Sequence, residues 1–156
     1  MKEDKKRSVL STVLIVLTVL QLVFIFSQSL FDAPASNEES GFIMKIVTPV
    51  FELFVGKGNV TMAIIRKTAH FVEFAVLGAL TASLAAIYGK RQYLSFAFSL
   101  LCCLAAAVTD ESIQLLSDGR SGQISDVLLD LSGAAVGTAA IILILLIRKA
   151  AKRRSR

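Results

Sequence analysis

Histidine and cysteine are scarce in this chain of 156 residues, which has one histidine and two cysteines. The two cysteines, Cys102 and Cys103, are adjacent and lie inside an apolar run, so they offer neither a framework of disulfide bridges nor metal-ligand spacing. A single histidine among carboxylates also lacks the spacing signature of a zinc site. We therefore predict no metal site, leave any cofactor unknown and interpret both cysteines as packing residues.

Charge is absent from long parts of the chain, and 54% of the residues are hydrophobic, which is typical of a membrane protein. Crossing the hydrocarbon of a bilayer takes about 20 apolar residues. The sequence predicts an all-α, polytopic membrane protein that forms a single domain over residues 1–156. Its four transmembrane helices are expected at about 8–31, 62–88, 93–114 and 124–147.

The first apolar run has a competing interpretation as a cleaved signal peptide, with Ala33-Pro34-Ala35 as the cleavage neighbourhood. Its length exceeds the roughly 7 to 15 apolar residues of such peptides, which favours a retained helix. Residues 32–61 have the composition of a loop between crossings. Within this loop, apolar residues recur at helical spacing over 42–54, which predicts a short amphipathic helix lying at the membrane interface.

Lysine and arginine residues lie mostly on one side of the predicted crossings. Residues 1–7, 90–91 and 148–156 hold four, two and six of them, which is twelve of the 17 in the chain. By the positive-inside rule, both termini and the basic tail 148–156 are cytoplasmic, and the loop 32–61 is extracytoplasmic. The net charge of +5 therefore reflects topology and anionic membrane lipids, and it does not indicate a nucleic-acid partner.

Polar residues gather at the extracytoplasmic ends of three predicted helices. On the second helix, spacings of three and four residues place Arg66, His70 and Glu73 on one stripe, with Lys67 beside it. The third helix ends with Asp110, Glu111 and Gln114, and the fourth carries one stripe of Asp126, Asp130, Gly133 and Gly137. Ionisable groups at membrane depth must be paired or wetted, so we expect the three polar ends to converge on one pocket.

The residue types in this pocket suggest roles in acid–base chemistry and in binding of an anionic group. We expect a catalytic set of His70 as general acid or base, Glu73 to orient it, and Asp110 and Glu111. The expected substrate-binding residues are Arg66, Lys67, Gln114, Arg120, Asp126 and Asp130. Five carboxylates then face three cations, so protonation or a bound hard cation must compensate the remaining charge.

Several motifs occur together in one order: Arg66-Lys67-x-Ala69-His70-Phe71-x-Glu73-Phe74, Asp110-Glu111-x-x-Gln114, Gly119-Arg120 and Asp126-Val127-Leu128-Leu129-Asp130-x-x-Gly133. In these motifs the chain resembles the VanZ-like family, although that family often has tyrosine at Phe74 and asparagine at Asp130. The resemblance implies a four-helix protein of the bacterial cell membrane that acts in the cell envelope and is related to teicoplanin tolerance. A lipid-linked or peptidoglycan precursor is the substrate that we expect, with hydrolysis or group transfer as the reaction.

Three alternatives remain from the sequence. The charged residues could form a structural ion-pair network that fixes helix register and binds no substrate. The protein could bind an envelope lipid or glycopeptide without reaction. A transporter is disfavoured because the cytoplasmic halves of the apolar runs lack ionisable residues.

The stripe of Gly133 and Gly137 could serve helix packing or a homodimer.

Overall fold

The computed structural model describes residues 2–30, 48, 52, 60–88, 92–116 and 123–155. Its long helices are α1 (Lys2–Leu30), α3 (Met62–Tyr88), α4 (Gln92–Gln114) and α5 (Ile124–Arg154), and these ranges contain no strand. All four helices are long and apolar enough to cross a membrane. The all-α prediction with four crossings is therefore confirmed, whereas the interfacial helix expected over 42–54 lies almost wholly outside the described residues and is not confirmed.

Helix boundaries agree closely with those expected, except at the two ends of the chain. The helix α1 begins at Lys2 and α5 continues to Arg154, so both helices include basic segments that the prediction placed outside the membrane-spanning runs. Lysine, arginine and alanine are strong helix formers, and basic groups in the last turn of α5 also complement the helix dipole. The basic tail is thus a helical extension of the fourth crossing.

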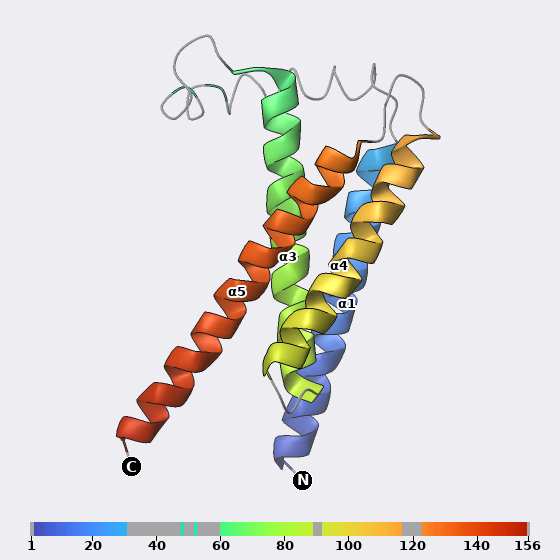
Figure 1. Ribbon diagram of the computed structural model, residues 1–156. Coiled ribbons are helices and arrows are strands. Elements are labelled where there is room, and N and C mark those ends of the chain that lie inside the picture. Colours follow the sequence, from blue (N-terminus) through green and yellow to red (C-terminus); the bar gives the residue numbers. More distant parts are fainter. Residues whose placement is uncertain are drawn as a thin grey trace.

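Helix α3 is the centre of the bundle (Figure 1). It packs against α1, α4 and α5, and α4 also contacts α1 and α5, whereas the backbones of α1 and α5 do not approach each other closely within the described helices. Figure 1 places both termini at one end of the bundle and the start of α3 at the other. The C-terminal half of α5 leans away from the other helices (Figure 1), and the buried residues of α5 all lie in its N-terminal half.

The close crossing of α3 and α5 depends on glycines in both helices. Gly133 lies against the backbone carbonyl of Phe71 and Gly137 against that of Ala75, while Gly78 of α3 meets the backbone of α5 in the same way. A Cβ atom at any of the three positions would collide with the opposing backbone. The glycine stripe therefore serves helix packing inside one chain. Pairing of two copies through these glycines would have to displace α3.

A cluster of buried hydroxyl groups joins α3, α4 and α5 near the middle of the bundle. The Oγ atom of Ser99 lies 2.6 Å from Oγ1 of Thr81 and 2.8 Å from Oγ1 of Thr138. The carbonyl oxygen of Gly78 lies 3.1 to 3.2 Å from all three hydroxyl oxygens, so it is an acceptor for whichever of their protons is not donated to a neighbouring group. Cys103 is fully buried in the adjoining apolar core, as a packing residue would be. These hydrogen bonds satisfy polar groups that lipid could not solvate.

Candidate functional site

The polar residues of the candidate site lie at the end of the bundle that is remote from the termini. The last turns of α1 and α4 and the first turns of α5 lie there beside α3, whose own start projects beyond them (Figure 1). Two hydrogen bonds between polar side chains join the helices there: Ser29 of α1 binds Asp110 of α4, and Lys67 of α3 binds Asp126 of α5. The expected convergence of the polar ends of α3, α4 and α5 is therefore observed for the residues that the structure describes.

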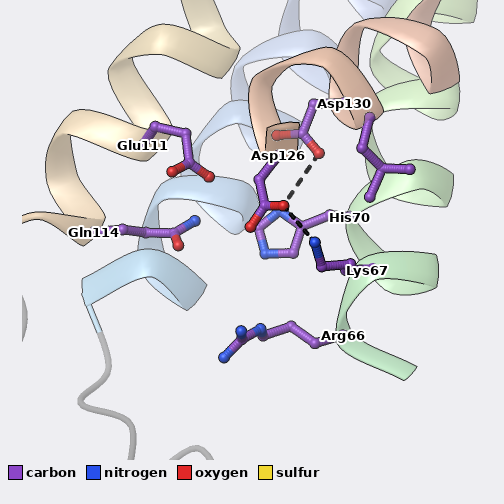
Figure 2. Close-up of a pocket in the computed structure, with 8 residues that line it drawn as sticks. Arg66, Lys67, His70, Glu111, Gln114, Asp126 and Asp130 are labelled. Carbon is purple, nitrogen blue, oxygen red and sulfur yellow. Dashed lines mark hydrogen bonds and ion pairs between the residues drawn. The ribbon is translucent and has the colours of Figure 1, made fainter. Parts of the chain in front are cut away.

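His70 and two aspartates form the centre of this site. The Nδ1 atom of His70 lies 3.7 Å from Oδ2 of Asp110 on α4 and 3.9 Å from Oδ1 of Asp130 on α5. Both aspartate side chains are almost fully buried, and that of His70 is 13% exposed. Figure 2 shows the second ring nitrogen turned away from Asp130. Because Nδ1 faces carboxylates, the imidazole presents Nε2 to any bound molecule.

Asp110 is held in place by uncharged donors from two helices. The hydroxyl of Ser29 donates to Oδ1 at 2.6 Å, and the side-chain amide of Gln114 donates to Oδ2 at 2.9 Å. All three side chains are buried. Asp110 thus has a fixed orientation toward His70, and α1 is tied to the site through Ser29.

Asp130 is buried without comparable support. Its side chain is 1% exposed, and neither of its carboxylate oxygens has a hydrogen-bond partner among the described residues. The nearest charged contact of the carboxylate is His70 at 3.9 Å, which is beyond hydrogen-bonding distance. A carboxylate in this position is unusual, because buried polar groups in folded proteins normally have at least one partner.

Two cations form the outer rim of the site (Figure 2). The Nζ atom of Lys67 donates to Oδ1 of Asp126 at 2.6 Å, in a pair that is partly exposed. Arg66 is exposed beside it. A small cavity of about 10 Å³ lies between this rim and the centre, and its lining includes Arg66, Lys67, His70, Glu111, Gln114, Asp126 and Asp130. That volume is close to what one water molecule requires.

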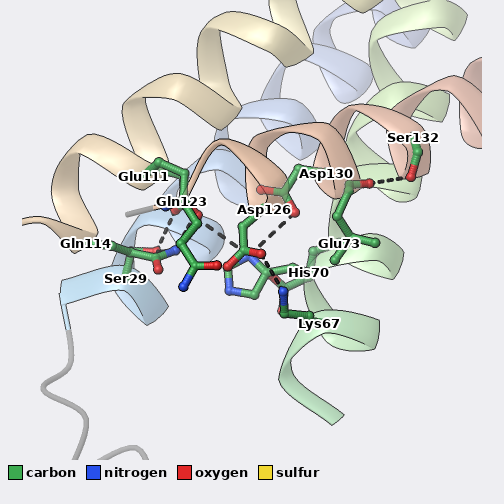
Figure 3. Close-up of polar contacts among 12 residues, drawn as sticks. Ser29, Lys67, His70, Glu73, Glu111, Gln114, Gln123, Asp126, Asp130 and Ser132 are labelled. Carbon is green, nitrogen blue, oxygen red and sulfur yellow. Dashed lines mark hydrogen bonds and ion pairs between the residues drawn. The ribbon is translucent and has the colours of Figure 1, made fainter. Parts of the chain in front are cut away.

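Glu111 connects α4 to the beginning of α5 (Figure 3). Its Oε2 atom accepts a hydrogen bond of 2.8 Å from the backbone N–H of Gln123, the N-cap residue of α5. A carboxylate at a helix N-terminus satisfies a free backbone donor and interacts favourably with the helix dipole. Glu111 was expected in the catalytic set, and the structure gives it a contact that positions α5.

Glu73 and Arg120 complete the set of residues expected from the sequence. The Oε2 atom of Glu73 is buried and has no hydrogen-bond partner in the described part of the chain. We expected Glu73 to orient His70, but the carboxylates that face Nδ1 are those of Asp110 and Asp130. Arg120 lies outside the described residues.

Sequence reasoning missed three residues that support the site. Ser29 binds Asp110, Gln123 binds Glu111, and the side-chain amide of Gln21 donates to the backbone carbonyl of Glu73 at 3.1 Å. Gln21 could have been noticed as an amide in the middle of an apolar run. Ser29 gave no such signal, because serine is common at helix ends and makes hydrogen bonds within its own helix.

Comparison with known proteins gives one informative result. A family model described as VanZ/LLP1 matches residues 12–147, which includes most of the chain and all the residues of the site described above. No curated protein and no solved structure matches the chain.

Proposed function

Because the chain belongs to the VanZ/LLP1 family of membrane proteins, we propose that its polar site binds the anionic headgroup of an envelope lipid or lipid-linked precursor. The reaction that we propose is hydrolysis or group transfer at that headgroup. Through it, the protein would confer tolerance to glycopeptides such as teicoplanin. The negative charge of the proposed headgroup is supported by the two cations, Arg66 and Lys67, that line the polar cavity.

The single observation that carries this proposal is the arrangement of the cationic rim above the buried centre. Arg66 is exposed, and its guanidinium can bind a phosphate or carboxylate through two parallel hydrogen bonds. Lys67 is paired with Asp126, but that pair is partly exposed, so an incoming phosphate can compete for the ammonium group. An anion held there would lie close to His70, because His70 lines the same cavity as Arg66 and Lys67.

His70 is the residue that we propose for proton transfer to or from the headgroup. It lines the cavity, and its Nδ1 atom faces Asp110 and Asp130. Because both carboxylates lie on the Nδ1 side of the imidazole, we propose Nε2 as the atom that meets the substrate. The cavity is close to the size of one water molecule, so we propose that the headgroup binds at the rim and the rest of the lipid remains in the bilayer.

We propose that the site is extracytoplasmic and that both termini are cytoplasmic. The basic segments at residues 1–7 and 148–156 support this orientation by the positive-inside rule. The arrangement of the helices is compatible with it, because both termini lie at the end of the bundle remote from the site (Figure 1). The lipid or precursor would then be one of the outer leaflet of the bacterial cell membrane.

Binding without reaction is a second candidate function, and the contacts of two carboxylates favour it. Asp110 is engaged by Ser29 and Gln114, and Glu111 is engaged by the backbone of Gln123. Two of the four residues expected to be catalytic therefore have structural partners. A protein that masks a headgroup needs the cationic rim but no proton transfer.

The test compares lipids and envelope precursors by mass spectrometry in a teicoplanin-sensitive host with and without the protein. We expect wild-type protein to raise teicoplanin tolerance and to change the covalent structure of one precursor or lipid. Arg66→Gln should lose both effects, because it removes the bidentate contact. Arg148→Gln is the matched control, since Arg148 is also exposed but lies near the opposite end of the bundle.

The outcome separates the two candidate functions. Tolerance with unchanged precursors and lipids would support binding alone. Full tolerance in the Arg66→Gln variant at normal protein level would contradict the proposed site.

A further inference from the structure

The three groups at the centre of the site come from three different helices and present donor atoms suited to a metal ion. His70, Asp110 and Asp130 each offer one ligand atom, and these atoms all lie within 4.8 Å of one another. Two of them are carboxylate oxygens and one is an imidazole nitrogen. The sequence showed no metal-ligand spacing, because such spacing is visible only when ligands lie close together along the chain.

The burial of Asp130 is the second observation that points to a ligand. Both of its oxygen atoms are buried and neither has a hydrogen-bond partner among the described residues. In Figure 2 the carboxylate is directed at His70, and the two groups are 3.9 Å apart. A buried polar group without a partner commonly marks the position of a water molecule or an ion.

The buried charge requires compensation that the described cations near the two aspartates do not provide. Asp110 and Asp130 are 0% and 1% exposed, and burying an ionised carboxylate costs several kcal/mol unless it is paired. The donors to Asp110 are the uncharged groups of Ser29 and Gln114, and Lys67 is engaged with Asp126. A divalent cation would neutralise both buried aspartates and supply the missing partner of Asp130.

The distances are compatible with coordination after movements of the side chains, since the three ligand atoms lie within 4.8 Å of one another. Ligands bound tetrahedrally at about 2.1 Å from an ion lie about 3.4 Å from one another. The distances from Nδ1 of His70 to the two aspartates, 3.7 and 3.9 Å, exceed this by a few tenths of an ångström. We infer that His70, Asp110 and Asp130 form a site for a divalent transition-metal ion such as Zn²⁺ or Mn²⁺.

Other features of the site agree with this inference. Ser29 and Gln114 orient the carboxylate of Asp110, as residues of the outer coordination shell do in metal sites. The cavity that His70 and Asp130 line opens toward the rim, which provides an entry path. Three protein ligands and a cavity leave room for a further ligand, and the mixed nitrogen and oxygen donors favour a transition metal over Mg²⁺ or Ca²⁺.

The inferred ion deepens the proposed function but does not depend on it. Coordination through Nδ1 leaves Nε2 of His70 directed at the headgroup, as proposed above. An ion beside the rim would also strengthen the attraction of a phosphate. A metal ion could be bound in a protein that has a different substrate, and the headgroup could be bound by the rim alone.

The test measures metal content in protein that is purified in detergent, freed of its affinity tag, stripped with a chelator and reloaded with Zn²⁺ or Mn²⁺. We expect about one ion per chain by elemental analysis. Asp130→Asn is nearly isosteric and breaks no hydrogen bond, so the variant should fold while its metal affinity falls at least about tenfold. Asp126→Asn, one helical turn away, is the matched control and should retain the ion.

Two further measurements test whether the cysteines bind the ion and whether His70 is a ligand. Replacing Cys102 and Cys103 together should leave the metal content unchanged, which excludes thiol ligands. The chain has one histidine, so ¹⁵N-labelling of histidine gives ring signals from His70 alone, and these should shift when Zn²⁺ is added.

Absence of a stoichiometric ion in wild-type protein, unchanged ring signals, or full metal binding by the Asp130→Asn variant would each overturn the inference. Headgroup binding and teicoplanin tolerance that persist after removal of all metal would leave the proposed function intact. A bound ion in a protein that has no effect on lipids or on teicoplanin tolerance would support the metal site and contradict the proposed function.

Discussion

Replacement of Ser29 by alanine tests whether α1 is part of the site. Ser29 is the last buried polar residue of α1, and its hydroxyl donates to Asp110 of α4 at 2.6 Å, with both side chains 0% exposed. The matched control is Ser27→Ala, two residues earlier in the same helix. The hydroxyl of Ser27 is exposed and donates only to the carbonyl of Phe24, within α1.

The expected cost of Ser29→Ala follows from the type of hydrogen bond that is lost. Hydrogen bonds to charged groups contribute about 1.5 to 3 kcal/mol, whereas interhelical bonds measured in membranes average about 0.6 and reach about 1.7 kcal/mol. Asp110 would keep its bond from Gln114, so the lower part of the first range applies. We expect a loss of about 1.5 kcal/mol in the free energy of unfolding, which is roughly a tenfold change in the folding equilibrium.

Reversible unfolding in mixed detergent micelles measures this difference. Ser27→Ala should change the free energy of unfolding by less than about 0.5 kcal/mol, as surface substitutions usually do. Equal effects of the two variants would refute the contact between Ser29 and Asp110. A double-mutant cycle with Asp110→Ala, which removes the acceptor, should give a coupling energy of the same order as the single loss.

Three further predictions concern packing, the rim and topology. Gly137→Leu should prevent the approach of α5 to Ala75 and abolish the folded bundle in unfolding assays, whereas Ala140→Leu, at an exposed position of α5, should be tolerated. Lys67→Met should weaken the binding of anionic lipid headgroups by the protein in vesicles more than tenfold. It should lower the free energy of unfolding by less than about 1 kcal/mol, since the pair of Lys67 with Asp126 is partly exposed. At the carboxyl terminus, a fused reporter that works only in the cytoplasm should be active. Activity of a fused reporter that works only outside the cytoplasm would contradict the orientation.

The four crossings could be predicted from the sequence because a bilayer imposes one simple requirement on helix length and polarity. The expected run at 62–88 coincides with α3, and the run at 124–147 lies within α5. The continuation of α5 to Arg154 was not anticipated, because hydropathy reports where a helix leaves hydrocarbon and not where its hydrogen bonds end. The prediction for 42–54 remains a prediction.

The candidate site was predictable as a group of residues but not as a set of contacts. Periodicity placed His70 and Asp130 on inward faces, yet it could not determine which carboxylate lies beside Nδ1, since that depends on the rotation and depth of three helices. It also assigned Glu111 to chemistry, whereas the residue binds the first backbone donor of α5. Contacts that cross between helices, such as those of Ser29 and Gln21, leave no periodic trace in a single sequence.

The contribution of polar groups by all four helices affects how the protein is made. During synthesis the first hairpin, α1 and α3, enters the bilayer with His70 and Glu73 before either buried aspartate has left the ribosome. Those groups have no partners in lipid until α4 and α5 follow. Membrane quality-control proteases should therefore recognise the nascent chain most readily in the interval before α5 is inserted, and truncation within α5 should shorten its lifetime sharply.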